Sequence, residues 1–179
     1  MSDGLGTWTA DTGTLTVASN LVTNPGGSAE NVYYDSAMAD TADHQTTLTT
    51  KNALTGEGAV ARRNATSKYY LSHNNGGNHQ LYKNNSGFTQ LGSTGAALAI
   101  NDTHGVGCVG TAISAYKNGA LDIGPITDST HATGKAGIRM FNGGTTADNW
   151  QVEVEGAAAV TVFNFIGNLF GRFLSLGGM

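Results

Sequence analysis

The stretch that decides the fold reads Thr111-Ala112-Ile113-Ser114-Ala115-Tyr116-Lys117-Asn118-Gly119-Ala120-Leu121-Asp122-Ile123. At its centre, the Asn118-Gly119 pair accepts positive φ at both central positions, as a type I′ turn between two antiparallel strands requires. Apolar residues precede and follow this pair, so we expect two strands to pair across it. The stretch therefore predicts a β-hairpin.

The same organisation extends outward over about residues 5–155. Segments with alternating apolar and polar residues, rich in Val, Thr and Tyr, are typical of half-buried strands, and Asn- and Gly-rich turns separate them. Amphipathic helices do not interrupt this series, which favours an all-β fold with two antiparallel sheets in one domain, residues 1–155. We expect the core to include Leu15, Val17, Leu48, Val60, Ile113, Ile138, Val152 and Val154.

Composition excludes some classes of function. Of the 179 residues, 12% are charged, and the formal net charge is −4 without any basic run. Nucleic-acid binding normally needs an electropositive face, so we expect no nucleic-acid partner. The single cysteine, Cys108, rules out a framework of intrachain disulfides, and we expect it to be a buried small apolar residue.

The region from Val106 to Phe141 resembles the concanavalin A-like, laminin-G-like domains. The motifs that carry the resemblance are the Asn-Gly hairpin, the turn at residues 127–130, and Thr133-Gly134-x-x-Gly137 followed by an apolar strand. The resemblance covers roughly residues 5–155 and implies a jelly-roll sandwich. Such domains include lectins, adhesion modules, glycanases and virion proteins, so the fold alone does not choose a function.

Three patterns that could carry chemistry are better explained by structure. The run from Gly105 to Gly110 matches a dinucleotide fingerprint by letter, but a strand follows it instead of the required helix. Glu153 and Glu155 share one side of a strand without the third acid of glycanases on this fold, so we expect them to face solvent. The histidines lack metal-binding spacing. We therefore predict no catalytic residue, no cofactor and no metal ligand.

Two adjacent tyrosine pairs are candidates for glycan contact. On a strand, one member of each pair faces the core and the other faces outward. Exposed aromatic rings stack on sugars, which makes Tyr33 and Tyr69 candidate glycan-contacting residues. The alternative, which we favour, is that these rings brace the surface of the sheet.

The C-terminal segment, residues 156–179, is an apolar tail. Its large side chains recur at three- and four-residue steps, which predicts an amphipathic helix, although two glycines weaken it. We expect the tail to dock on another polypeptide; packing on its own sandwich is the alternative, and membrane binding is disfavoured because only one residue is basic. The predicted docking residues are Phe163, Ile166, Leu169, Phe170, Phe173 and Leu174.

Two hypotheses of function follow. The first is a non-enzymatic structural protein of a bacteriophage virion, either a capsid decoration or a tail attachment component. It would be made in the host cytoplasm without a signal peptide and would bind other virion proteins or copies of itself. An adhesion-type fold without an export signal, low charge and the apolar tail favour it. The alternative is a carbohydrate-binding or adhesion module, with surface glycans as ligands, and a glycanase comes third.

Overall fold

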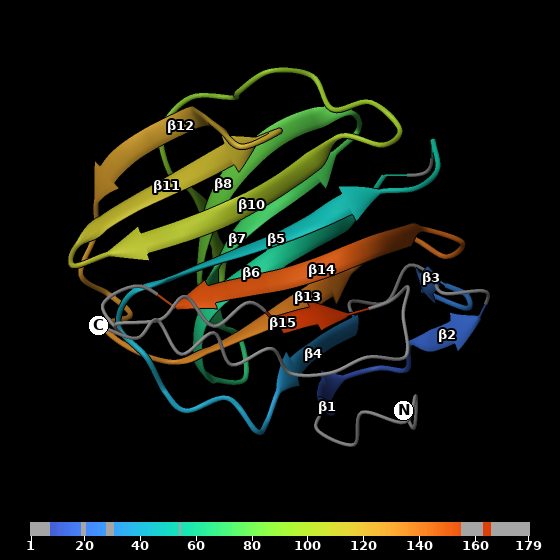
Figure 1. Cartoon of the computed structure of the whole chain (residues 1–179), viewed down its shortest axis with the longest axis horizontal. Coiled ribbons are helices and arrows are strands. Elements are labelled where there is room, and N and C mark those ends of the chain that lie inside the picture. The colour runs from blue at the N-terminus through green and yellow to red at the C-terminus, as the bar shows by residue number, and fades with distance from the viewer. Residues whose placement is uncertain (1–7, 19–20, 28–30, 54, 155–162, 166–179) are drawn as a thin grey trace, which may run out of the picture.

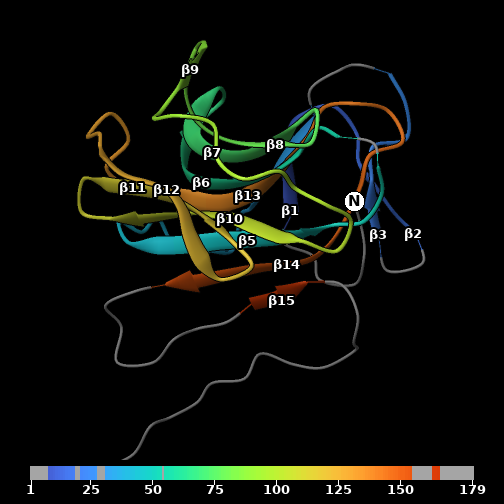
Figure 2. The same cartoon turned by 90° about the horizontal axis from the view of Figure 1, so that it is seen from above.

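The computed structural model describes residues 8–18, 21–27, 31–53, 55–154 and 163–165. This part of the chain forms fifteen strands in two antiparallel sheets that pack face to face (Figures 1 and 2). The predicted all-β sandwich is confirmed. Among the described residues no helix is long and apolar enough to cross a membrane.

One sheet has seven strands and interleaves the two halves of the chain. Its strands, in spatial order, are β1 (Trp8–Thr12), β4 (Asn31–Asp35), β13 (Lys135–Met140), β6 (Glu57–Ala65), β7 (Lys68–Asn75), β8 (Asn78–Asn85) and β9 (Phe88–Gln90). Strands far apart in sequence, β4 and β13, are direct neighbours in it. In Figure 2, β9 stands up from this sheet on the side away from β14.

The other sheet has eight strands. They are β12 (Ala120–Thr127), β11 (Ala112–Lys117), β10 (Thr103–Val109), β5 (His44–Thr50), β14 (Thr146–Val154), β3 (Leu21–Thr23), β2 (Thr16–Ala18) and β15 (Phe163–Phe165). Thr146 and Ala147 of β14 pair with β3, and the segment from Trp150 to Val152 pairs with β15. Both short strands therefore pair with the edge of β14 that does not pair with β5.

The position of β15 corrects one prediction about the tail. The apolar periodicity of the tail predicts an amphipathic helix that includes Phe163, but Phe163–Phe165 form a strand. The reason is that β14 extends beyond β3 and offers its backbone hydrogen-bonding groups to a further strand. The other predicted docking residues, Ile166, Leu169, Phe170, Phe173 and Leu174, lie outside the described residues.

The hairpin predicted from Asn118-Gly119 is confirmed. Both residues have positive φ, 49° and 79°, and β11 pairs with β12 directly across them. The turn between β7 and β8 has the same form, with φ of 63° at Gly76 and 81° at Gly77. Positive φ at two successive positions is the geometry that Asn and Gly tolerate best.

The predicted core is confirmed in the main. Two of its residues, Val17 and Val154, are partly buried, and Val60 faces outward from the seven-stranded sheet into a second, smaller cluster with Val32, Tyr69 and Leu71. The remaining five predicted residues are fully or almost fully buried between the sheets: Leu15, Leu48, Ile113, Ile138 and Val152.

The indole of Trp150 connects the two sheets. Its Nε1 donates a hydrogen bond of 2.8 Å to the carbonyl of Gly137, and its ring packs edge-on against Trp8 at 4.8 Å between centroids. A side chain at position 137 is excluded because its Cβ would lie 2.4 Å from the carbonyl oxygen of Tyr33. Gly137 of the predicted motif therefore has a packing role.

Arg62 closes the sandwich at the end where β5 begins. Its guanidinium is almost fully buried and donates hydrogen bonds to three backbone carbonyls, those of Ala42, Gly110 and His131. It also forms an ion pair of 3.3 Å with Asp43. One side chain thus holds together three loops that are distant in sequence.

We expect Arg62→Met to lower the free energy of unfolding by about 3–5 kcal/mol, because it leaves three backbone carbonyls without their donor, at roughly 1–3 kcal/mol for each buried group left unsatisfied. Chemical denaturation measures this. Lys68→Met, which removes a cation bound at the surface to Asn85, is the control and should cost less than about 0.5 kcal/mol. Equal effects of the two substitutions would contradict the role assigned to Arg62.

Candidate functional site

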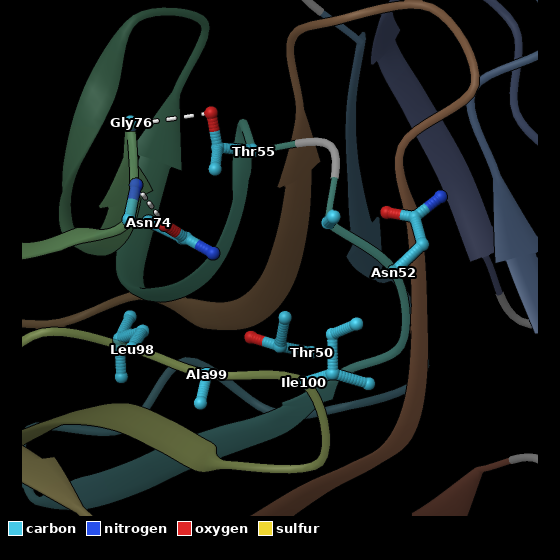
Figure 3. Close-up of a pocket in the computed structure, with 10 residues that line it drawn as sticks. Thr50, Asn52, Thr55, Asn74, Gly76, Leu98, Ala99 and Ile100 are labelled. Atoms are coloured by element: carbon cyan, nitrogen blue, oxygen red, sulfur yellow. Dashed lines mark hydrogen bonds between the residues drawn. The ribbon is translucent and has the colours of Figure 1, made fainter.

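A pocket of about 300 Å³ lies at the opposite end of the sandwich, where β5 ends (Figure 3). Three segments enclose it: Thr50 with the loop that follows, the β7–β8 turn from Asn74 to Gly77, and the segment 98–100 before β10. These segments are distant in sequence, and only the packing of the two sheets brings them together.

Backbone hydrogen bonds fix the walls of the pocket. The amide of Gly76 donates to Oγ1 of Thr55 at 3.1 Å, and the amide of Leu98 donates to the carbonyl of Gly77 at 2.8 Å. The amide of Asn101 donates to the carbonyl of Thr50 at 2.8 Å. Each wall is thereby tied to a neighbour, so the pocket is formed before any ligand enters.

The lining combines polar groups with an apolar wall. Nδ2 of Asn52 donates to the carbonyl of Gly144 at 2.7 Å, whereas its Oδ1 is buried and has no hydrogen-bond partner among the described residues. In Figure 3 the side chain of Asn52 points away from Leu98 and Ile100. Leu98 and Ile100 line the pocket as well, and Ile100 is 52% exposed. The lining thus brings polar and apolar residues together.

A buried carboxyl lies behind the lining. Glu57, the first residue of β6, is fully buried, and its Oε1 accepts hydrogen bonds of 2.7 Å from Oγ1 of Thr50 and from Nδ2 of Asn74. Oε2 has no hydrogen-bond partner among the described residues. Burial raises the pKa of Glu57 above its ordinary value of 4.5, and the two hydrogen bonds oppose this shift.

From Glu57 a chain of polar side chains crosses the interior. Nε2 of His104 lies 3.9 Å from Oε1 of Glu57, and Nδ1 of His104 is 2.8 Å from Oγ of Ser72. Ser72 is hydrogen-bonded in turn to Nε2 of His79 at 2.8 Å, and Nδ1 of His79 to Oδ2 of Asp122 at 2.6 Å. The chain ends at Asp122, whose side chain is 16% exposed.

Ser72, His79 and Asp122 have the connectivity of a hydrolase triad, but not its accessibility. The serine of such a triad must reach a substrate carbonyl, whereas Ser72 is fully buried and its hydroxyl is also bonded to His104. The arrangement therefore satisfies buried polar groups and does not present a nucleophile. The sequence gave no sign of it, because β7, β8 and β12 each supply one member.

The two tyrosines proposed to contact glycans are not exposed. Tyr33 is 5% exposed, and its hydroxyl accepts from the amide of Leu15 and donates to the carbonyl of Gly13. Tyr69 is 1% exposed and packs edge-on against Phe88. The glycan-contact prediction is therefore wrong for both: each ring is covered and braces the sheet, as the alternative held.

The exposed aromatic residues near that face are different ones. Phe88 is 43% exposed and Phe141 is 36% exposed, and the guanidinium of Arg139 lies 5.0 and 5.2 Å from their ring centroids. Nη1 of Arg139 donates to Nε2 of His73 at 3.0 Å. Burial, together with the Arg139 charge, lowers the pKa of His73 to about 3, so this imidazole is neutral and accepts.

The structure also places the glycine run, the glutamate pair and the cysteine that the sequence analysis considered. Gly105 and Gly107 lie on β10, and a Cβ on Gly105 would sit 2.3 Å from the carbonyl oxygen of Thr46, so the glycines serve a crowded strand. Glu153 is exposed on β14, and Glu155 lies outside the described residues. Burial raises the pKa of Cys108 to about 12, which keeps its thiol protonated.

Metal binding has no support in the described part of the chain, where no three His, Cys, Asp or Glu side chains are grouped to hold an ion. The loop acids are engaged elsewhere. Asp128 accepts from Tyr70 and Lys83 at 2.6 Å each, and Asp102 accepts from Asn118 at 2.8 Å. These carboxylates stabilise loops and turns.

Comparison with known proteins supports the fold. No family model matches the chain, and no curated protein matches its sequence. Among solved structures, the carbohydrate-binding module CBM66 from Bacillus subtilis matches with a TM-score of 0.65 and 17% identity, over 81% of this chain and 94% of that one. The SPRY domain of human HERC1 matches with a TM-score of 0.54 and 15% identity, over 75% of this chain and 90% of that one.

The carbohydrate recognition domain of Emp46p, in its metal-free form, matches with a TM-score of 0.51 and 7% identity, over 81% of this chain and 85% of that one. At such identities these likenesses show the fold alone. They agree with the lectin-like jelly roll that the sequence resemblance implied.

We expect the protein to lose stability as the pH falls from 6.5 toward 4.5. Burial lowers the pKa of every histidine, so the unfolded chain binds more protons than the folded chain in this window, and each histidine costs up to roughly 1.4 kcal/mol per pH unit. Glu57 has a raised pKa, so its protonation makes the opposite contribution and favours the folded chain as the pH falls. The histidines are His44, His73, His79, His104 and His131.

Denaturant unfolding at half-unit pH steps measures this loss. The free energy of unfolding should change little between pH 7 and 8, which serves as the internal control, and should decline steadily below 6.5. A constant value down to pH 4.5 would show that the histidines titrate normally in the folded protein.

Proposed function

We propose that this protein is a non-catalytic carbohydrate-binding module whose pocket at the end of the sandwich holds one sugar unit. The observation that carries the proposal is the lining of this pocket, in which polar residues of the loop after β5 and of the β7–β8 turn lie together with Leu98 and Ile100. A sugar ring presents hydroxyl donors at its edge and an apolar C–H face. A preformed cavity with a few convergent polar groups suits such a ligand.

The structural neighbours support this proposal over the virion hypothesis. CBM66 is a carbohydrate-binding module, and the Emp46p domain is a carbohydrate recognition domain. Their likeness to this chain concerns the fold, so the position of the ligand rests on the pocket itself. The absence of a reachable nucleophile at Ser72 fits a binding role rather than a hydrolytic one.

A virion location remains a separate proposal, supported by the apolar tail of residues 156–179. A capsid decoration or tail attachment component can itself carry a glycan-binding domain, so the two proposals are compatible. Genes for capsid, portal or tail proteins beside this one would support the virion proposal.

Removing residues 166–179, which retains β15, should leave a folded β domain with unchanged glycan affinity if the tail serves only for docking. Circular dichroism and glycan binding of the truncated chain measure this. Failure of that chain to fold would place the tail in the core of the domain.

We expect Ile100→Asp to weaken binding of the glycan at least tenfold, because it places a charge in the apolar wall of the pocket. A glycan array identifies the ligand, and calorimetry measures the affinity. Val109→Asp is the matched control: Val109 is 50% exposed, against 52% for Ile100, and lies at the opposite end of β10. An equal loss in both variants, or no binding by the wild type, would argue against the pocket as the sugar site.

A further inference from the structure

The outer face of the seven-stranded sheet, which is the face turned away from the core, carries two exposed phenylalanines held by one arginine. Ile138 and Met140 of β13 point into the core, so Arg139 between them points to the outer face. The guanidinium of Arg139 lies 5.0 Å from the ring centroid of Phe88 and 5.2 Å from that of Phe141. One cation thus brings together β9 and the loop after β13, which are distant in sequence.

The arginine and the second ring are themselves fixed by the sheet. Nη1 of Arg139 donates to Nε2 of His73 at 3.0 Å, and the His73 ring is hydrogen-bonded to the backbone of Gly56. The amide of Phe141 donates to the carbonyl of Gly56 at 3.0 Å. Arg139 and Phe141 therefore hold their positions without a ligand, which lowers the entropy cost of binding one.

A row of hydroxyl and amide groups continues from the first ring. Phe88 packs edge-on against Tyr82 with 5.8 Å between centroids, and the Tyr82 hydroxyl donates to Oε1 of Gln80 at 2.6 Å. The same oxygen accepts from Nδ2 of Asn75 at 2.8 Å. Leu81 points into the core, so Gln80 and Tyr82 on either side of it face outward. Amide and hydroxyl groups both donate and accept hydrogen bonds, as the hydroxyls of a sugar do.

This outer surface reaches the pocket on two sides. Asn75 belongs to the β7–β8 turn, and its neighbours on both sides in sequence line the pocket. On the other side, Phe141 is bonded to Gly56, which directly follows Thr55 of the pocket lining. A ligand longer than one sugar unit can therefore extend from the pocket onto the outer face.

We propose that Gln80, Tyr82, Phe88 and Phe141 form a second sugar-contacting surface, and that the protein binds a neutral oligosaccharide of several units. The inference rests on the proposed function and extends it beyond the pocket. Aromatic rings suit the apolar C–H face of a sugar, and the amide and hydroxyl row suits the hydroxyls at its edge. Arg139 is 5% exposed and lies against both rings, so it positions them and presents little charge to a ligand, which favours a neutral sugar over an acidic one.

The first test compares ligands of different length on the full chain. The neutral glycan that the array selects is measured by calorimetry in a series from its terminal monosaccharide to its tetrasaccharide. Wild-type affinity should rise about tenfold or more along the series, because the added units cover the exposed rings. Equal affinity for the monosaccharide and the tetrasaccharide overturns the inference and leaves the proposed function intact.

The second test locates the gain in affinity. Phe141→Ala should weaken tetrasaccharide binding about tenfold and leave monosaccharide binding unchanged, whereas Phe141→Trp should keep both affinities. Leu121→Ala, at a 53% exposed position on β12 of the other sheet, is the matched control and should change neither. Circular dichroism verifies that each variant is folded. Unchanged tetrasaccharide affinity in Phe141→Ala overturns the inference.

The positioning role of Arg139 has its own readout. Arg139→Lys keeps the charge but lacks the planar group that lies against both rings, so it should weaken the tetrasaccharide and spare the monosaccharide. An equal loss for both sugars would show a merely structural role and overturn this assignment.

The proposed function and this inference fail in different ways. Tetrasaccharide binding that is lost in Phe141→Ala but kept in Ile100→Asp would overturn the pocket as the sugar site and retain the outer surface. Absence of binding to every sugar overturns both.

Discussion

Every polar group between the two sheets must find a partner, because water does not reach it there, and this constraint shapes both ends of the sandwich. At the end where β5 begins, Arg62 resolves it by donating to three backbone carbonyls and to Asp43. Arg62 has a positive φ of 51° and lies in an irregular part of β6, a conformation that is costly for a residue with a side chain. The packed surroundings hold that strained position, which directs the guanidinium inward.

At the other end, the same constraint is met only in part, and that end has the pocket. Among the described residues, Asn52, Glu57 and His104 each keep one buried polar atom without a hydrogen-bond partner at this end, and Thr46 of β5 keeps one nearer the other end. Buried polar atoms without partners are costly, and the pocket lies at the end that keeps three of them. At the Arg62 end, the guanidinium is bonded to protein groups, which indicates a structural role. The other end has the pocket and is the candidate binding site.

Much of the fold was predictable because it depends on neighbours along the chain. Alternation of apolar and polar residues specifies strands and their inward positions, and Ile113 and Ile138 are accordingly buried. Asn118-Gly119 specifies the hairpin because positive φ at both positions is a local property. The expected burial of Cys108 also held, since free cysteine behaves as a small apolar residue.

The candidate site was not predictable, because alternation identifies the face of a strand but not what covers that face. Tyr33 and Tyr69 point to opposite sides of their sheet, yet the packing of Phe88 and the second sheet buries both rings. Phe163 forms a strand rather than a helix because β14 offers free backbone groups. The sequence by itself thus determined strands, turns and the sandwich. Only the tertiary structure placed Asn52, Asn74 and Leu98 around one pocket and aligned His79, Ser72 and His104 behind it, because these contacts join segments that the sequence keeps apart.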